Sequence, residues 1–424
     1  MRFGHSGIYA GLALVLLLGG ACYSERSPWS AQQQQLIHGL SLAAKGPLRP
    51  PASNQYAMRQ DAADFGKQLF FDPTLSGASN VSCASCHQPD KAFTDGLATG
   101  KGVGKLPRNT PSAIGLSDSS WFYWDGRKDS LWSQALAPIE AGAEMNSSRL
   151  QVVRAIGTNL NYRRQYQAIF GSYPLQLLAT QWSRPASPIG AAARQENWYR
   201  MPAPLREQVN RVFANIGKAL AAYEHTLQYS DSRFDRYARA LSGRDYARAE
   251  SLLSKDELAG LALFIDSSKT QCLNCHNGPA FSNRDFHNIG SGRLQGAQLD
   301  FGRFLGVQSV LLDEFNCSGR YSDAPAGGCD HLRFINKQVD DHLRGAYKTP
   351  SLRNLVLTAP YFHDGRFDSL EQVLDYYLSE ENQLAANRNS ELLPLQLSSD
   401  EQRQLLAFLR SLTSHSLPAD KQAQ

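Results

Sequence analysis

The sequence lacks the features of several common protein classes. Its 424 residues carry 43 basic and 39 acidic side chains, a net charge of +4, with no basic run. Nucleic acid is therefore not an expected partner. No segment alternates apolar and polar residues with period two, so few strands are expected. The apolar run from Ile8 to Leu18 is too short to span a bilayer comfortably.

The N-terminus instead resembles an export signal. Arg2 supplies positive charge ahead of the apolar run, and small residues precede Cys22. Residues 1–21 are therefore predicted to be a signal peptide of the lipoprotein type, with a lipid anchor on Cys22 and a periplasmic location. The alternative is ordinary cleavage nearby, which would leave Cys22 free.

Only seven cysteines are present, and four of them form two copies of one motif. Cys83-Ala84-Ser85-Cys86-His87 and Cys272-Leu273-Asn274-Cys275-His276 both match the attachment signature of a c-type haem. A zinc site needs four ligands close together, and neither motif has a second Cys or His pair nearby. A redox dithiol does not explain the histidine that follows each pair. The motifs predict two covalent haems, with His87 and His276 as iron ligands.

Two further cysteines, Cys317 and Cys329, lie twelve residues apart in a loop that contains glycine and proline. An oxidising compartment favours a disulfide between them.

The remaining pattern predicts a mostly α-helical protein with long loops. Helices are expected at 62–71, from an N-cap at Ser130 to a stop at Pro138, and at 151–170, 204–227, 233–253, 369–377 and 399–412, and residues 255–264 lead into the second haem motif. Residues 173–201 are interpreted as a loop excursion. The haem motifs lie 189 positions apart (272 minus 83). This spacing suits two cytochrome c-like domains, 55–243 and 244–415, each with one haem, after a polar linker at 22–54 that tethers or wraps the first domain.

Several segments around the motifs resemble one family. They are Phe71-Asp72-Pro73, residues 92–96 and 107–111, Trp124-Asp125-Gly126-Arg127, and residues 349–354 and 358–365. Together they resemble the bacterial di-haem cytochrome c peroxidase superfamily, over roughly Ala62 to Ser411. That superfamily includes MauG-type enzymes, which oxidise tryptophans of a partner protein.

The resemblance implies an open iron at the first haem. Typical members carry a removable histidine after the first motif, but no histidine occurs between Gln88 and Glu224. Gly102-Val103-Gly104 occupies the expected place. An iron with one open side binds peroxide, so the N-terminal haem is the expected peroxide site. Lys101 or Lys105 is the alternative ligand there, and either would first have to lose a proton.

The second haem of typical members carries a methionine ligand, but the last methionine here is Met201. The matching position, fourteen residues after His363, is Tyr377, as in the MauG branch. Its neighbour Tyr376 is the alternative ligand, and a third interpretation is that both tyrosines only pack a helix.

The resemblance also assigns the groups around the two irons. Glu144 is the expected acid–base group and Gln134 orients peroxide, with Glu140 as the competing carboxylate. Trp124 is expected between the haems. Asn109 and the backbone oxygens of Thr358 and Pro360 match a calcium position.

These observations predict a periplasmic di-haem oxidoreductase that reacts with hydrogen peroxide and oxidises a partner protein. The alternative enzyme is a cytochrome c peroxidase that removes peroxide, with a small cytochrome or cupredoxin as electron donor. A di-haem electron carrier without chemistry of its own is the non-enzymatic alternative.

Overall fold

A computed structural model describes residues 27–292, 299–335, 340–379, 390–393 and 395–417. The predicted signal peptide, residues 1–21, and the predicted anchor at Cys22 lie outside these ranges. Among the described residues, no helix has the length and apolar character needed to cross a membrane.

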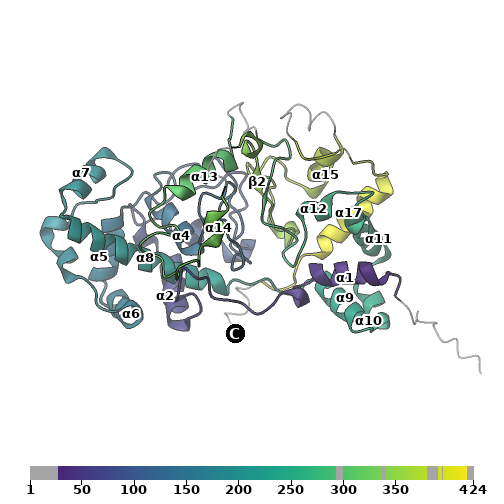
Figure 1. The fold of residues 1–424 in the computed structure, drawn as a ribbon, viewed down its shortest axis with the longest axis horizontal. Coiled ribbons are helices and arrows are strands. Elements are labelled where there is room, and N and C mark those ends of the chain that lie inside the picture. Colours follow the sequence, from purple (N-terminus) through teal and green to yellow (C-terminus); the bar gives the residue numbers. More distant parts are fainter. Residues whose placement is uncertain (1–26, 293–298, 336–339, 380–389, 394, 418–424) are drawn as a thin grey trace, which may run out of the picture.

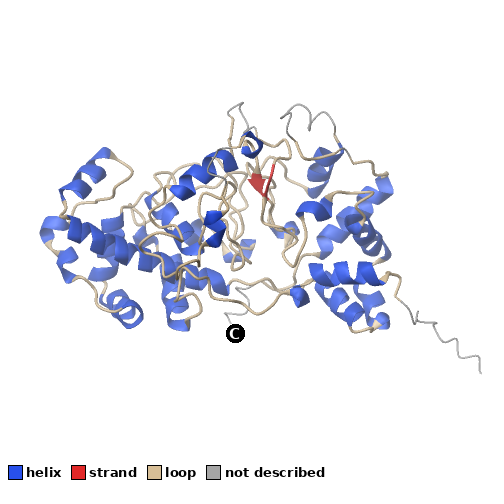
Figure 2. Ribbon diagram, viewed as in Figure 1, coloured by secondary structure: helices blue, strands red, loops and turns tan. Residues whose placement is uncertain are grey.

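The described chain is mostly helical, with long loops between the helices (Figure 2). The helices of the first half are α1 (Ala31–Leu40), α2 (Gln60–Phe71), α3 (Cys83–Cys86), α4 (Leu131–Glu140), α5 (Arg149–Thr158), α6 (Leu160–Phe170), α7 (Ala192–Arg200) and α8 (Ala203–Thr226). Those of the second half are α9 (Arg233–Ser242), α10 (Tyr246–Leu252), α11 (Lys255–Ile265), α12 (Cys272–Cys275), α13 (Arg303–Leu311), α14 (Asp330–Arg333), α15 (Leu370–Leu378) and α17 (Ser399–Ser411). The strands β1 (Phe286–His287) and β2 (Tyr347–Lys348) form one short antiparallel pair.

Two large hydrophobic cores organise these helices. In the first core, α8 packs against α2, α4 and α5, and it buries its apolar face, including Val212, Phe213 and Ile216. In the second, α11 packs against α17 and α9 packs against α10. The helices of the two cores occupy opposite halves of Figure 1. The expected domain bounds, 55–243 and 244–415, remain a prediction, although α9 already belongs to the second core.

The helix that precedes each haem motif crosses a partner helix at a glycine. In α2, a Cβ added to Gly66 would lie 1.9 Å from the carbonyl oxygen of Ala219 in α8. In α11, a Cβ added to Gly260 would lie 2.0 Å from the carbonyl oxygen of Gln404 in α17. Both helices therefore cross a partner at backbone contact distance, which only glycine permits. Each crossing lies just before a motif, so it fixes the chain that enters α3 or α12.

Most predicted helices are confirmed. The 62–71, 204–227, 369–377 and 399–412 predictions correspond to α2, α8, α15 and α17, and the Ser130 side chain caps α4 by accepting the N–H of Ser133.

Four predictions differ from the structure. The 233–253 helix is broken at Gly243, which ends α9, and it resumes as α10 at Tyr246. Pro138 does not end α4, which continues to Glu140 with the proline inside it. The 151–170 helix is broken at Asn159, whose side chain caps the second piece, α6, by accepting the N–H groups of Asn161 and Tyr162. The 173–201 excursion contains α7, in which Trp198 is buried against the first core.

The segment interpreted as a polar linker also contains a helix. Ile37 and Leu40 of α1 lie on one face of the helix and are fully buried in the second core, against α9. This segment therefore packs on the far end of the molecule from α2 (Figure 1). The sequence signal was weak because only two apolar side chains in a glutamine-rich stretch carry the contact.

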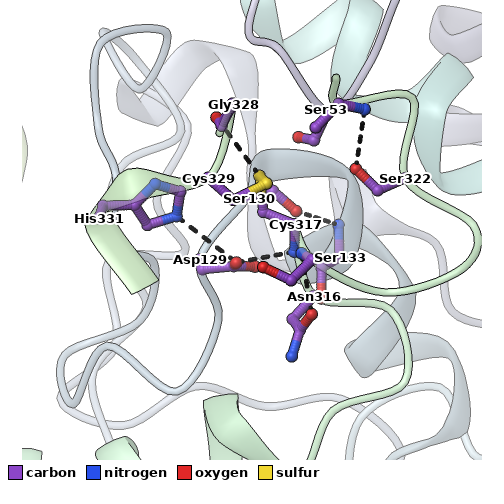
Figure 3. The surroundings of a disulfide bond; sticks show 12 residues. Ser53, Asp129, Ser130, Ser133, Asn316, Cys317, Ser322, Gly328, Cys329 and His331 are labelled. Atoms are coloured by element: carbon purple, nitrogen blue, oxygen red, sulfur yellow. Dashed lines mark hydrogen bonds and ion pairs between the residues drawn. A yellow bond between two sulfur atoms is a disulfide. The ribbon is translucent and has the colours of Figure 1, made fainter. Parts of the chain in front are cut away.

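The predicted disulfide between Cys317 and Cys329 is confirmed, with an S–S distance of 2.10 Å. Figure 3 shows the bond beside Asp129, which accepts the N–H of Cys317, and beside His331 of α14. The bond joins a third, small apolar cluster that includes Val310 and Leu332.

The helix crossing at Gly260 yields a stability prediction. We expect Gly260→Ala to lower the free energy of unfolding by about 1–3 kcal/mol, because the new methyl group overlaps the Gln404 carbonyl. Thermal unfolding followed by circular dichroism measures the change. Gly39→Ala in α1 is the matched control, because its Cβ meets nothing within 4 Å, and it should stabilise by about 0.5–1 kcal/mol. Equal melting temperatures for the two variants would contradict the packing argument.

Candidate active site

The two Cys-x-x-Cys-His motifs fold in the same way. Each forms one helical turn in which the histidine N–H bonds to the carbonyl of the first cysteine, Cys83 or Cys272. Each imidazole Nδ1 then lies 3.0 Å from a backbone oxygen, Phe93 for His87 and Phe281 for His276. A metal-binding histidine is commonly oriented by such a bond, which leaves Nε2 for the metal.

The protonation of these groups fits metal binding and excludes a redox dithiol. Burial lowers the pKa of His87 and lowers the pKa of His276 to about 4, so both imidazoles are neutral. Neutral imidazole is the form that coordinates iron. Burial raises the pKa of the Cys86 thiol to about 11 and that of the Cys272 thiol above its usual value. Thiols of exchange-active dithiols have lowered pKa values instead.

A cavity of about 330 Å³ opens beside the second motif. Cys272, Cys275 and His276 line it together with Tyr377 of α15 and mostly apolar side chains. Burial raises the pKa of Tyr377, and the neighbouring Cys272 adds to the increase. Tyr377 and the second motif, about a hundred residues apart in sequence, therefore line one cavity.

Tyr376 has a different environment. Its hydroxyl donates a hydrogen bond to the carbonyl oxygen of Ile289 at 2.8 Å, and the side chain is buried against Phe362 and Phe367. Between the two tyrosines, only Tyr377 lines the cavity of the second motif.

Glu144 is half-buried near the first motif. Burial raises its pKa, which Arg127 partly opposes, and its charge raises the pKa values of the Cys83 and Cys86 thiols. The competing carboxylate, Glu140, is buried elsewhere in an ion pair with Arg149 at 3.0 Å. Glu144 is therefore the predicted carboxylate that faces the first motif.

The hairpin at residues 101–105 is hydrogen-bonded to the backbone of Ala143 and Glu144. Val103 N–H donates to the carbonyl of Glu144 and Gly104 N–H to that of Ala143, both at 2.8 Å. A Cβ added at Gly102 would lie 2.4 Å from the Glu144 carbonyl oxygen. The side chains of Lys101 and Lys105 are exposed on this hairpin.

Gln134 and two residues that sequence reasoning missed complete this group. The Oε1 atom of Gln134 is buried and has no hydrogen-bond partner among the described residues. The Tyr123 hydroxyl donates to the Gln134 carbonyl at 3.3 Å, and the Arg127 guanidinium lies 3.5 Å from the Tyr123 ring centroid. Tyr123 directly precedes the Trp-Asp-Gly-Arg segment and Arg127 is its last residue, so their position at this motif was the available sequence signal.

Trp124 lies at the joint between the two halves. Its indole N–H donates to the carbonyl oxygen of Asn109 at 2.9 Å, and the N–H of Asn109 donates to the carbonyl oxygen of His363 at 2.8 Å. Trp124, Asn109, Thr358, Pro360 and His363 all line the cavity of the second motif. The residues predicted for the inter-haem region and for calcium are thus brought together.

The Trp124 and His363 segments are copies of one local fold. Trp124-Asp125-Gly126-Arg127 and His363-Asp364-Gly365-Arg366 each close a loop, through the bridges Phe122–Lys128 and Tyr361–Phe367. Each loop then leads to a serine that caps the next helix, α4 or α15. Sequence analysis did not detect this internal repeat, although Asp-Gly-Arg and Asp-Ser-Leu occur in both copies.

The residues present fit two c-type haems. Each motif offers two thiols outside any disulfide and an oriented, neutral imidazole, and the second motif faces an apolar cavity.

Comparisons with known proteins agree with this site. Residues 60–242 match the family model described as di-haem cytochrome c peroxidase. The chain is 31% identical to the methylamine utilization protein MauG of Methylorubrum extorquens over 405 residues, which is 94% of this chain and 92% of that protein. It is 30% identical to the cytochrome-c peroxidase IdrP2 of Pseudomonas sp. (strain SCT), over 89% of this chain and 87% of that protein.

A solved structure shares the fold. It is described as a MauG-like protein associated with microbial copper homeostasis, with a TM-score of 0.62 and 26% identity, over 90% of this chain and 96% of that chain. The fold is therefore mostly α, with two cytochrome c-like domains. The chain belongs to the di-haem cytochrome c peroxidase family that includes MauG, and it is a peroxide-dependent oxidoreductase with two c-type haems.

Proposed function

We propose that this enzyme reacts with hydrogen peroxide at its N-terminal haem and oxidises aromatic side chains of a partner protein. The observation that carries the proposal is the position of Tyr377 in the cavity of His276, in a chain whose last methionine is Met201. A thioether ligand favours ferrous iron, as an electron-transfer peroxidase requires. A phenolate favours higher oxidation states, as an oxidant of protein side chains requires.

At the first site, Glu144 is the proposed acid–base residue. It is a half-buried carboxylate beside the first motif, and desolvation raises its pKa, which brings it closer to neutral pH. It would take the proton from the near oxygen of peroxide and return one to the far oxygen. Gln134, with its free Oε1, would accept a hydrogen bond from peroxide and orient it. The hairpin at 101–105 fixes Glu144 through its backbone and supplies no histidine.

At the second site, His276 and Tyr377 would hold the haem iron, as His87 would at the first. The two bound haems would supply irons that exchange electrons and react with peroxide. The high pKa of Tyr377 does not oppose ligation, because a coordinating metal ion displaces the proton.

Trp124 is the proposed electron path between the two sites. Trp124 lines the cavity of the second motif. Its neighbour Tyr123 donates a hydrogen bond to the carbonyl oxygen of Gln134, and the charge of Glu144 raises the pKa of Tyr123. The hydrogen bond from the indole of Trp124 to Asn109 holds the ring in place. The indole would thereby shorten the transfer distance between the haems.

We also propose a calcium ion at this joint, held by Asn109 and the backbone oxygens of Thr358 and Pro360. The three residues line one cavity, and neutral oxygens with water suit a hard cation. A periplasmic location is proposed as well, because covalent haem attachment and the Cys317–Cys329 disulfide both suit an oxidising compartment.

Peroxide removal with a small cytochrome or cupredoxin as donor is the second candidate. The relative from Pseudomonas sp. (strain SCT), named a cytochrome-c peroxidase, favours it. Family membership favours either enzyme over an electron carrier without chemistry.

Steady-state kinetics distinguish the two enzymes. We expect slow turnover of the as-isolated enzyme with peroxide and ferrocytochrome c, because a phenolate-ligated second haem accepts electrons poorly. The measurement is the peroxide-dependent oxidation of ferrocytochrome at 550 nm without prior reduction of the enzyme. Fast turnover under these conditions would contradict partner oxidation and favour peroxide removal.

Replacement of Glu144 tests the acid–base role. We expect Glu144→Gln to slow the reaction of the ferric enzyme with peroxide by about 10²–10⁴-fold, measured by stopped-flow absorbance. In the wild type the rate should rise with pH through the pKa of Glu144, because only the carboxylate accepts a proton, and burial places that rise above the usual range for glutamate. The variant should lose this rise. Glu196→Gln, at an exposed ion pair with Arg200, is the control and should retain the wild-type profile.

Replacement of Tyr377 tests the ligand. We expect Tyr377→Met to raise the reduction potential of the C-terminal haem and to change its low-spin electron paramagnetic resonance signal, because a thioether replaces the phenolate. Tyr376→Phe removes a hydroxyl that donates to the carbonyl oxygen of Ile289, so the signal of this variant should match the wild type. A spectral change in Tyr376→Phe alone would assign the ligand to Tyr376.

A further inference from the structure

Lys348 is a half-buried lysine close to Trp124. It belongs to β2, and its backbone N–H donates to the carbonyl oxygen of Trp124 at 2.8 Å. Its side chain extends to the segment before Trp124, where Nζ donates to the carbonyl oxygen of Trp121 at 2.9 Å. Both ends of the residue are thereby fixed against the Trp121–Trp124 segment, and the ammonium group has one defined position.

The ammonium group has no carboxylate partner in the described part of the chain. The carboxylate that acts on it most is that of Asp125, which is paired with Arg108 at 2.6 Å and with Arg127 at 3.1 Å. Lys128 provides the contrast, because its ammonium is paired with Asp313 at 2.5 Å. Loss of hydration without a counter-ion is unfavourable for a charge, so an anion beside Lys348 would stabilise it, and the described residues place no carboxylate against its ammonium group.

Burial lowers the pKa of Lys348 to about 7, and repulsion from Arg284 contributes. An adjacent carboxylate would raise that pKa and keep the amine charged. An anion bound beside Lys348 would therefore stabilise the charged form of its amine.

The cavity next to Lys348 is the one beside the second haem motif. Lys348 lines the same cavity as Cys272, Cys275 and His276. A haem carries two propionate carboxylates, which are the anions that a haem brings into its cavity. We propose that Lys348 is the ionic partner of a propionate of the C-terminal haem, and that its charge raises the reduction potential of that haem.

The other cations that line the cavity are already engaged. Arg353 makes two hydrogen bonds to the buried carboxylate of Asp235, at 2.8 and 3.0 Å. Arg284 donates to the carbonyl oxygen of Gly115 at 3.1 Å and lies 3.9 Å from Asp118. Of the three cations Arg284, Lys348 and Arg353, Lys348 is the one without a carboxylate partner among the described residues.

Spectroelectrochemical titration of the haem-loaded enzyme tests the proposal. Lys348→Met should lower the reduction potential of the C-terminal haem, because a nearby positive charge favours the ferrous state and low polarity strengthens the effect. Lys348→Arg, which keeps the charge, should hold the potential near the wild-type value. Lys269→Met is the control, since this lysine is only three residues from Cys272 but is half-exposed in a pair with Glu401. Its potential should stay unchanged because water screens the charge.

An unchanged potential in Lys348→Met with both haems present would overturn the proposal. If Lys348→Met loses haem, the wild type and Lys348→Arg are compared at rising pH. The wild-type potential should fall when the amine loses its proton, whereas a guanidinium stays charged and the potential of Lys348→Arg should not show this fall. The fixed charges around the amine, Arg284 and Asp125, are the same in both. An identical alkaline fall in the two proteins would overturn the proposal. The readout requires no partner protein, so it is independent of the proposed partner oxidation.

Discussion

The structure depends on the bond that fixes each haem-motif histidine to a backbone carbonyl. His87 and His276 each lie in a single helical turn, and the Nδ1 of each contacts the carbonyl of a phenylalanine five or six residues later. Both phenylalanines, Phe93 and Phe281, adopt a positive φ that a non-glycine residue reaches only under local constraint. The close glycine crossings of α2 with α8 and of α11 with α17 set the entry of the chain into each turn. Covalent attachment and iron ligation can then act on groups already in position.

The joint between the halves is built from the repeated Asp-Gly-Arg loops and from charges that cross between them. Arg108 binds Asp125 of the first loop and, through two hydrogen bonds, Asp300 of the second half. The backbone of Asn109, the next residue, links Trp124 to His363. Its carbonyl oxygen accepts the indole N–H of Trp124, and its N–H donates to the carbonyl oxygen of His363. Side chains with proposed roles at both haems are therefore attached to one rigid segment. Such a joint suits an enzyme whose two irons must exchange electrons at a fixed separation.

The two copies of this loop are followed by different chemistry. Trp124 and His363 occupy the same place in the two copies, and counting forward from them Gln134 matches Val373 while Pro138 matches Tyr377. In the first copy the following helix contributes the amide of Gln134 near the first motif. In the second copy it contributes a phenol to the cavity of His276. One local fold thus presents different side chains at equivalent helix positions in its two copies.

The sequence alone determined the two haem motifs, the helical class, most helix positions and the Cys317–Cys329 pairing, because each depends on local spacing or on a small set of available partners. It could not show that Pro138 lies inside α4 or that α1 packs on the second core, since these depend on neighbours remote in sequence. It also left open the choice between Tyr376 and Tyr377, which sit side by side on α15. Only the tertiary structure placed one phenol in the cavity and bound the other to Ile289. It alone brought Lys348 against the same cavity, because burial and missing counter-ions are properties of packing and not of sequence.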